Sequence, residues 1–182
     1  MVEGSRHPFA TLTPDRVLDA IDAAGLHADG RLLALNSYEN RVYQVGIEDD
    51  GFVVAKFYRP ERWSDAAIRE EHAFTLQLAE REIPAVPPLR LSSGDTLAHA
   101  GGFRVAVFAR RGGRAPDLDQ AGVREWLGRF IGRIHAVGGT RCYAERGRLD
   151  IASYGETPGD FVLACPHLPA DLRAAYRVAL AA

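Results

Sequence analysis

The stretch FVVAKFY at residues 52–58 decides the fold, because it places a lysine inside an otherwise apolar strand. Side chains alternate along a strand, so Val54, Lys56 and Tyr58 are expected to share one face of a sheet. Two interpretations of this lysine are open. Either it points to water from an edge strand, where it blocks pairing with other chains, or it meets an acidic partner on that face.

The segment that follows, residues 64–81, has the period of an amphipathic helix, and Ser64 is expected to cap its start. Glu71 falls near the centre of the apolar stripe, which consists of Ala67, Phe74 and Leu78. Because burial of a lone carboxylate is costly, we expect Glu71 to pair with Lys56 on the preceding strand. The alternative is a glutamate at the helix edge that reaches solvent.

The polar turn NSYENR at residues 36–41 precedes the lysine strand. Its backbone N–H groups and the Ser37 hydroxyl are suited to an anion, but alone the turn is equally an ordinary hairpin, because no phosphate-loop motif is present. Together with Lys56 and Glu71 it has the layout of a kinase-type small lobe, in which the turn covers phosphates, the lysine holds them and the glutamate holds the lysine. Val54 would then line the adenine pocket, and residues 105–109 would lead into a hinge.

The order of the expected elements indicates an α+β fold, with an antiparallel sheet first and a helical part afterwards. Strands are expected at 31–36, 40–47, 52–58, 89–92, 96–99 and 103–108, with Asp49-Asp50-Gly51 as a turn, and helices at 14–24, 64–81, 119–137 and 170–182. Asp117 and Asp119 are expected to cap the third helix, and residues 140–168 have no clear pattern. We divide the chain into a first lobe at 1–109 and a hinge with the start of a second lobe at 110–182.

Composition excludes several other classes of function. The 22 Lys and Arg residues balance 24 Asp and Glu residues, whereas a general nucleic-acid binder normally has a basic excess. No run of ~18 apolar residues predicts a membrane span, and no secretory signal is visible at the start. The only cysteines, Cys142 and Cys165, favour a reduced cytoplasmic chain, and neither a metal-ligand spacing nor a G-x-S-x-G motif occurs.

The sequence resembles the stress response kinase A group, a branch of the aminoglycoside phosphotransferase and choline kinase-like superfamily. The resemblance extends from about residue 9 to 139, and it is carried by LNSYENRVYQV at 35–45, KFYRPERW at 56–63, EEHAFTLQL at 70–78 and GRFIGRIHAVG at 128–138. It implies a bilobal, ATP-dependent Ser/Thr protein kinase that uses Mg²⁺ and acts in stress protection. It assigns Ser37 to the phosphate loop, Lys56 to the α- and β-phosphates, and Glu71 to the lysine.

The chain departs from this family in one respect, because none of its six histidines begins a His-Gly-Asp catalytic loop. The Gly159-Asp160-Phe161 segment is only superficially similar to a metal-binding motif. We therefore expect no catalytic residue and no metal ligand in this chain, with the Mg²⁺ ligands in a missing C-terminal part. The chain alone is predicted to be inactive.

Other functions stay open at this point. The chain is alternatively a non-catalytic module that binds a nucleotide or a partner, a fragment of a small-molecule phosphotransferase of the aminoglycoside or choline type, or a gene fragment without function. The expected partners of the preferred interpretation are ATP and a protein substrate with Ser or Thr, with no nucleic acid and no membrane.

Overall fold

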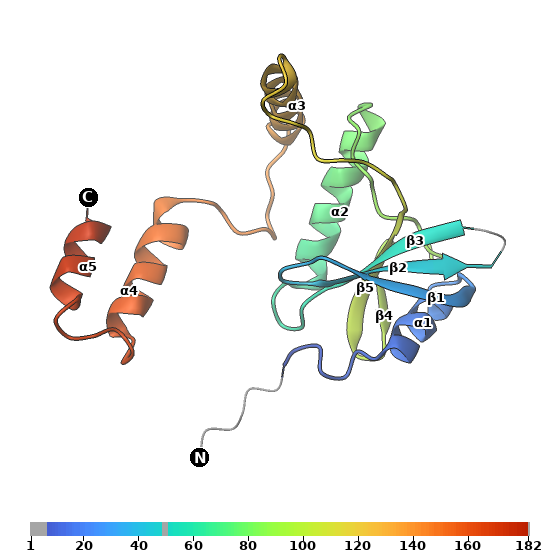
Figure 1. Cartoon of the computed structure of the whole chain (residues 1–182), viewed down its shortest axis with the longest axis horizontal. Helices are drawn as coiled ribbons and strands as arrows, with labels where there is room; N and C mark the ends of the chain where they lie inside the picture. The colour runs from blue at the N-terminus through green and yellow to red at the C-terminus, as the bar shows by residue number, and fades with distance from the viewer. Residues whose placement is uncertain (1–6, 49–50, 182) are drawn as a thin grey trace. The chain divides into compact units, whose positions relative to one another are not determined.

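A five-stranded antiparallel sheet organises the first part of the chain (Figure 1). The computed structural model describes residues 7–48 and 51–181, which form one unit up to Glu145 and a second from Arg146 onward. The sheet order is β1-β2-β3-β5-β4, and every neighbouring pair is antiparallel. The elements of the first unit are α1 (Pro14–Ala23), β1 (Ala28–Leu35), β2 (Arg41–Ile47), β3 (Gly51–Phe57), α2 (Asp65–Glu80), β4 (Ala98–Ala100), β5 (Phe103–Ala109) and α3 (Val123–Gly138).

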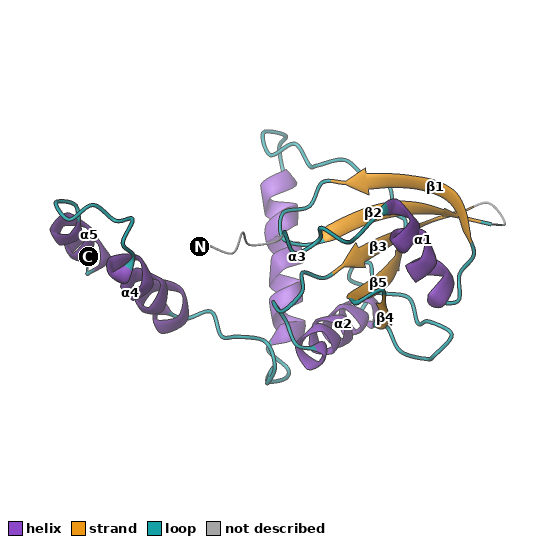
Figure 2. Ribbon diagram, turned by 90° about the horizontal axis from the view of Figure 1, so that it is seen from below, coloured by secondary structure: helices purple, strands orange, loops and turns teal. Residues whose placement is uncertain are grey.

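Alternation along β3 directs its side chains into two different cores. Val53, Ala55 and Phe57 are buried in a cluster that also contains the α1 residues Val17 and Ile21. On the other face, the α2 residue Ile68 packs with Tyr58, Leu97 and Ala106. The two helices therefore cover opposite faces of the sheet (Figure 2).

Local capping explains where the first two helices begin and where the first one ends. The Thr13 hydroxyl accepts the Arg16 N–H, and the Ser64 hydroxyl accepts the Ala67 N–H at 3.0 Å, so both expected N-caps are confirmed. The first helix stops at Gly25, whose φ of +86° is unfavourable for residues with a side chain.

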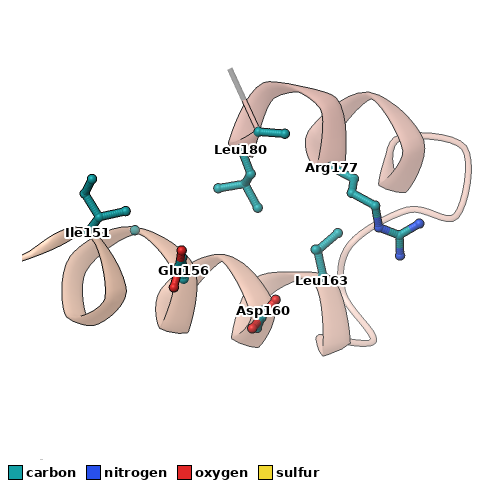
Figure 3. Close-up of a pocket in the computed structure, with 8 residues that line it drawn as sticks. Ile151, Glu156, Asp160, Leu163, Arg177 and Leu180 are labelled. Carbon is teal, nitrogen blue, oxygen red and sulfur yellow. The ribbon is translucent and has the colours of Figure 1, made fainter.

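The second unit is helical and contains η1 (Ala152–Glu156), α4 (Thr157–Ala164) and α5 (Arg173–Leu180). A hollow of about 430 Å³ lies between them, and Leu180 and Arg177 of α5 face it opposite Glu156, Asp160 and Leu163 (Figure 3). A Cβ atom at position 159 would lie 2.7 Å from the Leu180 side chain, so glycine allows α4 and α5 to pack closely.

Three expectations for local structure are wrong. Residues 152–164 are helical rather than irregular, because Pro158 occupies the start of α4 and Gly159 makes room for a neighbouring helix, so neither breaks it. Residues 89–92 form no strand and contribute only backbone hydrogen bonds beside an isolated bridge at Pro88.

The third error concerns the start of α3. Asp117 and Asp119 do not cap this helix, whose N-cap is Gly122 in a left-handed conformation. Asp117 instead accepts the Asp119 N–H within a local turn, and Asp119 pairs with Arg124.

The α+β fold class is confirmed, whereas the expected lobe boundary after residue 109 stays a prediction. The expected turn at Asp49-Asp50-Gly51 lies largely outside the described residues. Among the described residues, no helix is both long enough and apolar enough to cross a membrane.

Candidate functional site

The structure brings Lys56 of β3 and Glu71 of α2 together as an ion pair. The Lys56 Nζ donates to the Glu71 Oε1 at 2.8 Å, and the two side chains are 23% and 27% exposed. The pair is therefore accessible from solvent while it is fixed by the sheet and the helix. Lys56 is also the only lysine in the sequence, since every other one of the 22 Lys and Arg residues is arginine.

A buried polar chain lies beside this pair. The Lys56 Nζ lies 4.5 Å from the centre of the Tyr58 ring, a favourable position for a cation over an aromatic face. The Tyr58 hydroxyl is 2.8 Å from the His72 Nε2, and the His72 Nδ1 is 2.8 Å from the Thr96 Oγ1. Burial is the main cause that lowers the pKa of His72 to about 4, so this histidine is neutral at pH 7.

Strand register defines the surface next to the lysine. Lys56 lies opposite Val42 on β2 and Ala106 on β5, and Val54 lies opposite Gln44 and Phe108. Residues directly opposite each other in antiparallel strands project on the same face. Val42, Val54 and Phe108 are all half-buried. The ammonium group thus borders a partly open, mainly apolar sheet face, which is suited to a flat ring that carries a negatively charged group.

The turn at residues 36–41 is fixed by contacts to the segment that follows β3. The Asn40 side chain accepts the Arg59 N–H at 3.1 Å, and Arg62 donates to Glu39 at 2.7 Å. Ser37 donates its hydroxyl hydrogen to the Asn40 carbonyl at 2.9 Å, which closes the turn on itself. The predicted phosphate contact of Ser37 stays a prediction.

A charge cluster fastens the start of α2 to the sheet. Asp65 accepts hydrogen bonds from Arg104 at 2.5 Å and pairs with His99 at 2.9 Å. Arg69, one turn later, pairs with Asp95 at 2.8 Å. The hydrogen bond from Arg104 lowers the pKa of Asp65, and that from Arg69 lowers the pKa of Asp95. These bonds fix the helix that carries Glu71.

Sequence reasoning predicted Lys56, Glu71, Val54 and Ser37 as site residues, and this assignment stays a prediction. It missed the groups that contact them. The alternation in FVVAKFY placed Tyr58 on the lysine face, yet nothing in the sequence indicated its bond to His72 or the bond of His72 to Thr96. Those contacts depend on tertiary packing, because Tyr58 follows β3 and Thr96 precedes β4, 14 and 24 positions from His72 in the sequence.

Within residues 7–48 and 51–181, no cluster of three or more His, Cys, Asp and Glu side chains is arranged to hold a metal ion. Asp160 lies within helix α4 rather than in a loop that follows a strand. The described residues therefore do not fit the Mg²⁺ that the resemblance implies, and we derive no step through a metal.

The model of the phosphotransferase enzyme family matches residues 31–180 of the sequence. The chain belongs to the phosphotransferase enzyme family. The match includes the turn at 36–41, the lysine strand and α2, so these family elements are the ones that form the site described above.

Curated relatives of this chain are named as kinases. The stress response kinase A of Salmonella choleraesuis (strain SC-B67) is 40% identical over 168 residues, which are 92% of this chain and 51% of that protein. The stress response kinase A of Escherichia coli (strain K12) is 39% identical over 175 residues, which are 96% and 53% of the two proteins. The resemblance to this group is confirmed. The chain spans about half the length of these relatives.

A solved structure confirms the kinase-like fold of this chain. It is described as the amicoumacin kinase hAmiN in complex with AMP-PNP, Ca²⁺ and Ami. The TM-score is 0.66 at 20% sequence identity, and the match covers 86% of this chain and 49% of that one. At this identity the likeness shows the fold alone.

Proposed function

We propose that this chain is the ATP-binding part of a stress response kinase, which transfers a phosphoryl group from ATP to Ser or Thr of a protein. The observation that carries the proposal is the accessible Lys56–Glu71 ion pair beside a partly open apolar sheet face. The sequence identity to kinases of that name supports the stress response branch. Because the chain spans about half of those relatives, the activity and the protein substrate of the whole kinase are part of the proposal.

Each residue of the site has a distinct role in this proposal. The Lys56 ammonium holds the α- and β-phosphates of ATP and offsets their negative charge, and Glu71 holds the lysine in place. The face that includes Val54 receives the adenine ring. The turn at 36–41 covers the phosphates with its backbone N–H groups as donors. Ser37 would join them by turning its hydroxyl hydrogen from the Asn40 carbonyl to a phosphate oxygen.

Phosphoryl transfer needs more than these groups. Positioning and neutralisation of charge account for most of its catalysis, and a base and divalent-metal ligands normally supply part of both. We propose that the 182 residues bind ATP without transferring phosphate at a measurable rate. Mg²⁺ as the metal of the whole kinase rests on the family resemblance.

Isothermal titration calorimetry with ATP tests the binding site. We expect Lys56→Ala to weaken ATP binding at least about tenfold, because one charge-assisted contact to phosphate contributes roughly 1.5–3 kcal/mol. Arg59→Ala is the matched control. It removes the same charge from an exposed side chain three residues later, and we expect ATP affinity to stay unchanged.

Two results would contradict the proposal. One is a folded wild-type chain that does not bind ATP at millimolar concentration. The other is equal ATP affinity in the wild type and in Lys56→Ala, which would place the nucleotide elsewhere on the chain.

A further inference from the structure

Two neighbouring glutamates on α2 contact different parts of the first unit. Glu71 contacts Lys56, whereas the Glu70 carboxylate accepts the backbone N–H groups of Ala144 at 2.7 Å and of Glu145 at 3.0 Å. Consecutive helix positions differ by about 100° around the axis, so the two carboxylates project in different directions. One turn of helix therefore connects the lysine to a chain segment more than 70 residues further along.

Other residues of α2 contact the same distant segment, residues 140–145. Phe74 packs edge-on against Tyr143, with 5.6 Å between the ring centres, and Gln77 donates to the Thr140 hydroxyl at 3.4 Å. Glu70, Phe74 and Gln77 occupy positions i, i+4 and i+7, which form one stripe of a helix. The segment 140–145 is thus bound along a single face of α2.

We propose that Glu70 is a positioning residue through which the segment 140–145 controls the affinity of the nucleotide site. Glu70 binds the segment, so the position of the segment affects the position of α2. Glu71, on the same helical turn, in turn determines where the lysine lies. This inference rests on the proposed function, because the ligand whose affinity changes is ATP. It adds that a part of the chain distant from Lys56 tunes that affinity.

The strength of the anchor follows from its chemistry. A carboxylate that accepts two N–H groups forms charge-assisted hydrogen bonds, which are about twice as strong as neutral ones. Binding coupling is reciprocal, so a segment that favours ATP binding must itself be held more firmly once ATP is bound. The Ala144 and Glu145 amides report this directly, because their hydrogens are the ones that Glu70 accepts.

The main test compares Glu70→Gln with Glu80→Gln in the whole 182-residue chain. Both variants remove one negative charge from α2, but Glu80 is exposed at the far end of that helix. We expect Glu70→Gln to weaken ATP binding about fivefold, the lower end of typical coupling between sites, and Glu80→Gln to leave it unchanged.

Hydrogen exchange measured by mass spectrometry gives the reciprocal readout. We expect ATP to slow exchange in the segment 140–145 of the wild-type chain and to have little effect there in Glu70→Gln. If Glu70 only stabilised the structure, Glu70→Gln would change hydrogen exchange in the segment 140–145 to the same extent with and without ATP.

A second pair of variants keeps the test valid if Glu70→Gln does not fold. Tyr143→Leu removes the ring that packs on Phe74, whereas Tyr143→Phe removes a buried hydroxyl that has no hydrogen-bond partner among the described residues. We expect the first to weaken ATP binding and the second to leave it unchanged.

The outcomes separate the inference from the proposed function. If the wild type binds ATP and neither Glu70→Gln nor Tyr143→Leu changes that affinity, the coupling is wrong and the proposed function stands. If the folded wild type does not bind ATP, both are wrong.

Discussion

At the scale of single residues, Lys56 is held between a carboxylate and an aromatic ring. Its Nζ contacts the Glu71 Oε1 at 2.8 Å and lies 4.5 Å from the centre of the Tyr58 ring. An ammonium group is a compact charge with three donors, whereas a guanidinium is a planar fork. The only lysine of the sequence therefore lies where a compact cation is suitable. It contacts one carboxylate oxygen and still has donors for a ligand.

The first prediction concerns the partner of this lysine. Glu71→Gln keeps the side-chain shape but removes the charge that holds Lys56, so we expect ATP affinity to fall about tenfold. The free energy of unfolding should change by less than about 1 kcal/mol, because the pair is partly exposed. Calorimetry measures the affinity and urea unfolding measures the stability. Unchanged ATP affinity in this variant would contradict the role of Glu71.

The second prediction concerns pH. Burial lowers the pKa of His72 from its usual 6.5 to about 4. The unfolded chain therefore binds this proton more readily than the folded chain between these values, and stability must decrease as the pH falls from 6.5 to 4. The loss is up to about 3 kcal/mol.

Comparison with a variant that does not titrate isolates this effect. His72→Gln should be less stable at pH 7, because Tyr58 and Thr96 change partner, but its stability should vary less between pH 6.5 and 4. The lowered carboxyl pKa values of Asp65 and Asp95 reduce stability mainly below about pH 5, and they do so equally in both proteins. If urea unfolding gave both proteins the same dependence of stability on pH, that dependence would come from groups other than His72.

At the scale of elements, the turn before β2 and the segment after β3 form one structural unit. Asn40 accepts the Arg59 N–H, and Glu39 pairs with Arg62. These four residues belong to LNSYENR and KFYRPERW, two of the stretches on which the expected family resemblance was based. The contacts give a physical reason for both stretches to be present in one chain, because residues of KFYRPERW hold the turn of LNSYENR in position.

The third prediction tests this fixation. Asn40→Ala removes the acceptor of the Arg59 N–H, so we expect a loss of about 1 kcal/mol in the free energy of unfolding and faster hydrogen exchange at residues 36–41. Tyr38→Ala in the same turn is the control, since its side chain is fully exposed and its stability should change by less than about 0.5 kcal/mol. Equal exchange of the turn in Asn40→Ala and wild type would refute its attachment through this bond.

Elements with strong local signals could be predicted from the sequence. Ser64 caps α2 as expected, and the alternation in FVVAKFY placed Val54 and Lys56 on one face. Helix α4 could not be found in this way, because the reason that Gly159 is tolerated is the Leu180 side chain, which approaches from a different helix. The hydrogen bond that the Ala144 N–H donates to Glu70 could not be predicted for the same reason, since it depends on tertiary packing.

At the scale of the whole molecule, the predicted nucleotide site lies entirely in the unit that ends at Glu145. Its parts come from a sheet, a turn and one helix. Helix α2 contacts the lysine, Thr96 in the segment before β4, and the segment 140–145. The second unit contributes none of the residues that we assign to ATP.

The fourth prediction belongs to this scale. The 182-residue chain, supplied with ATP, Mg²⁺ and a mixture of Ser- and Thr-containing peptides, should show no phosphate transfer above background. The physical reason is that the described residues supply no metal-binding cluster to neutralise the transferring phosphoryl group. Radioactive phosphate transfer measures the rate. Transfer that disappears in Lys56→Ala would show that the chain is catalytically active by itself.

The most direct test of ATP binding at Lys56 uses the single lysine. A chain labelled with ¹⁵N only at lysine gives one backbone amide signal in a ¹⁵N–¹H spectrum, from Lys56 itself. We predict that ATP shifts this signal in a saturable way and that Glu71→Gln needs about ten times more ATP for the same shift. A signal that does not move at millimolar ATP, in a chain shown to be folded, would contradict the account.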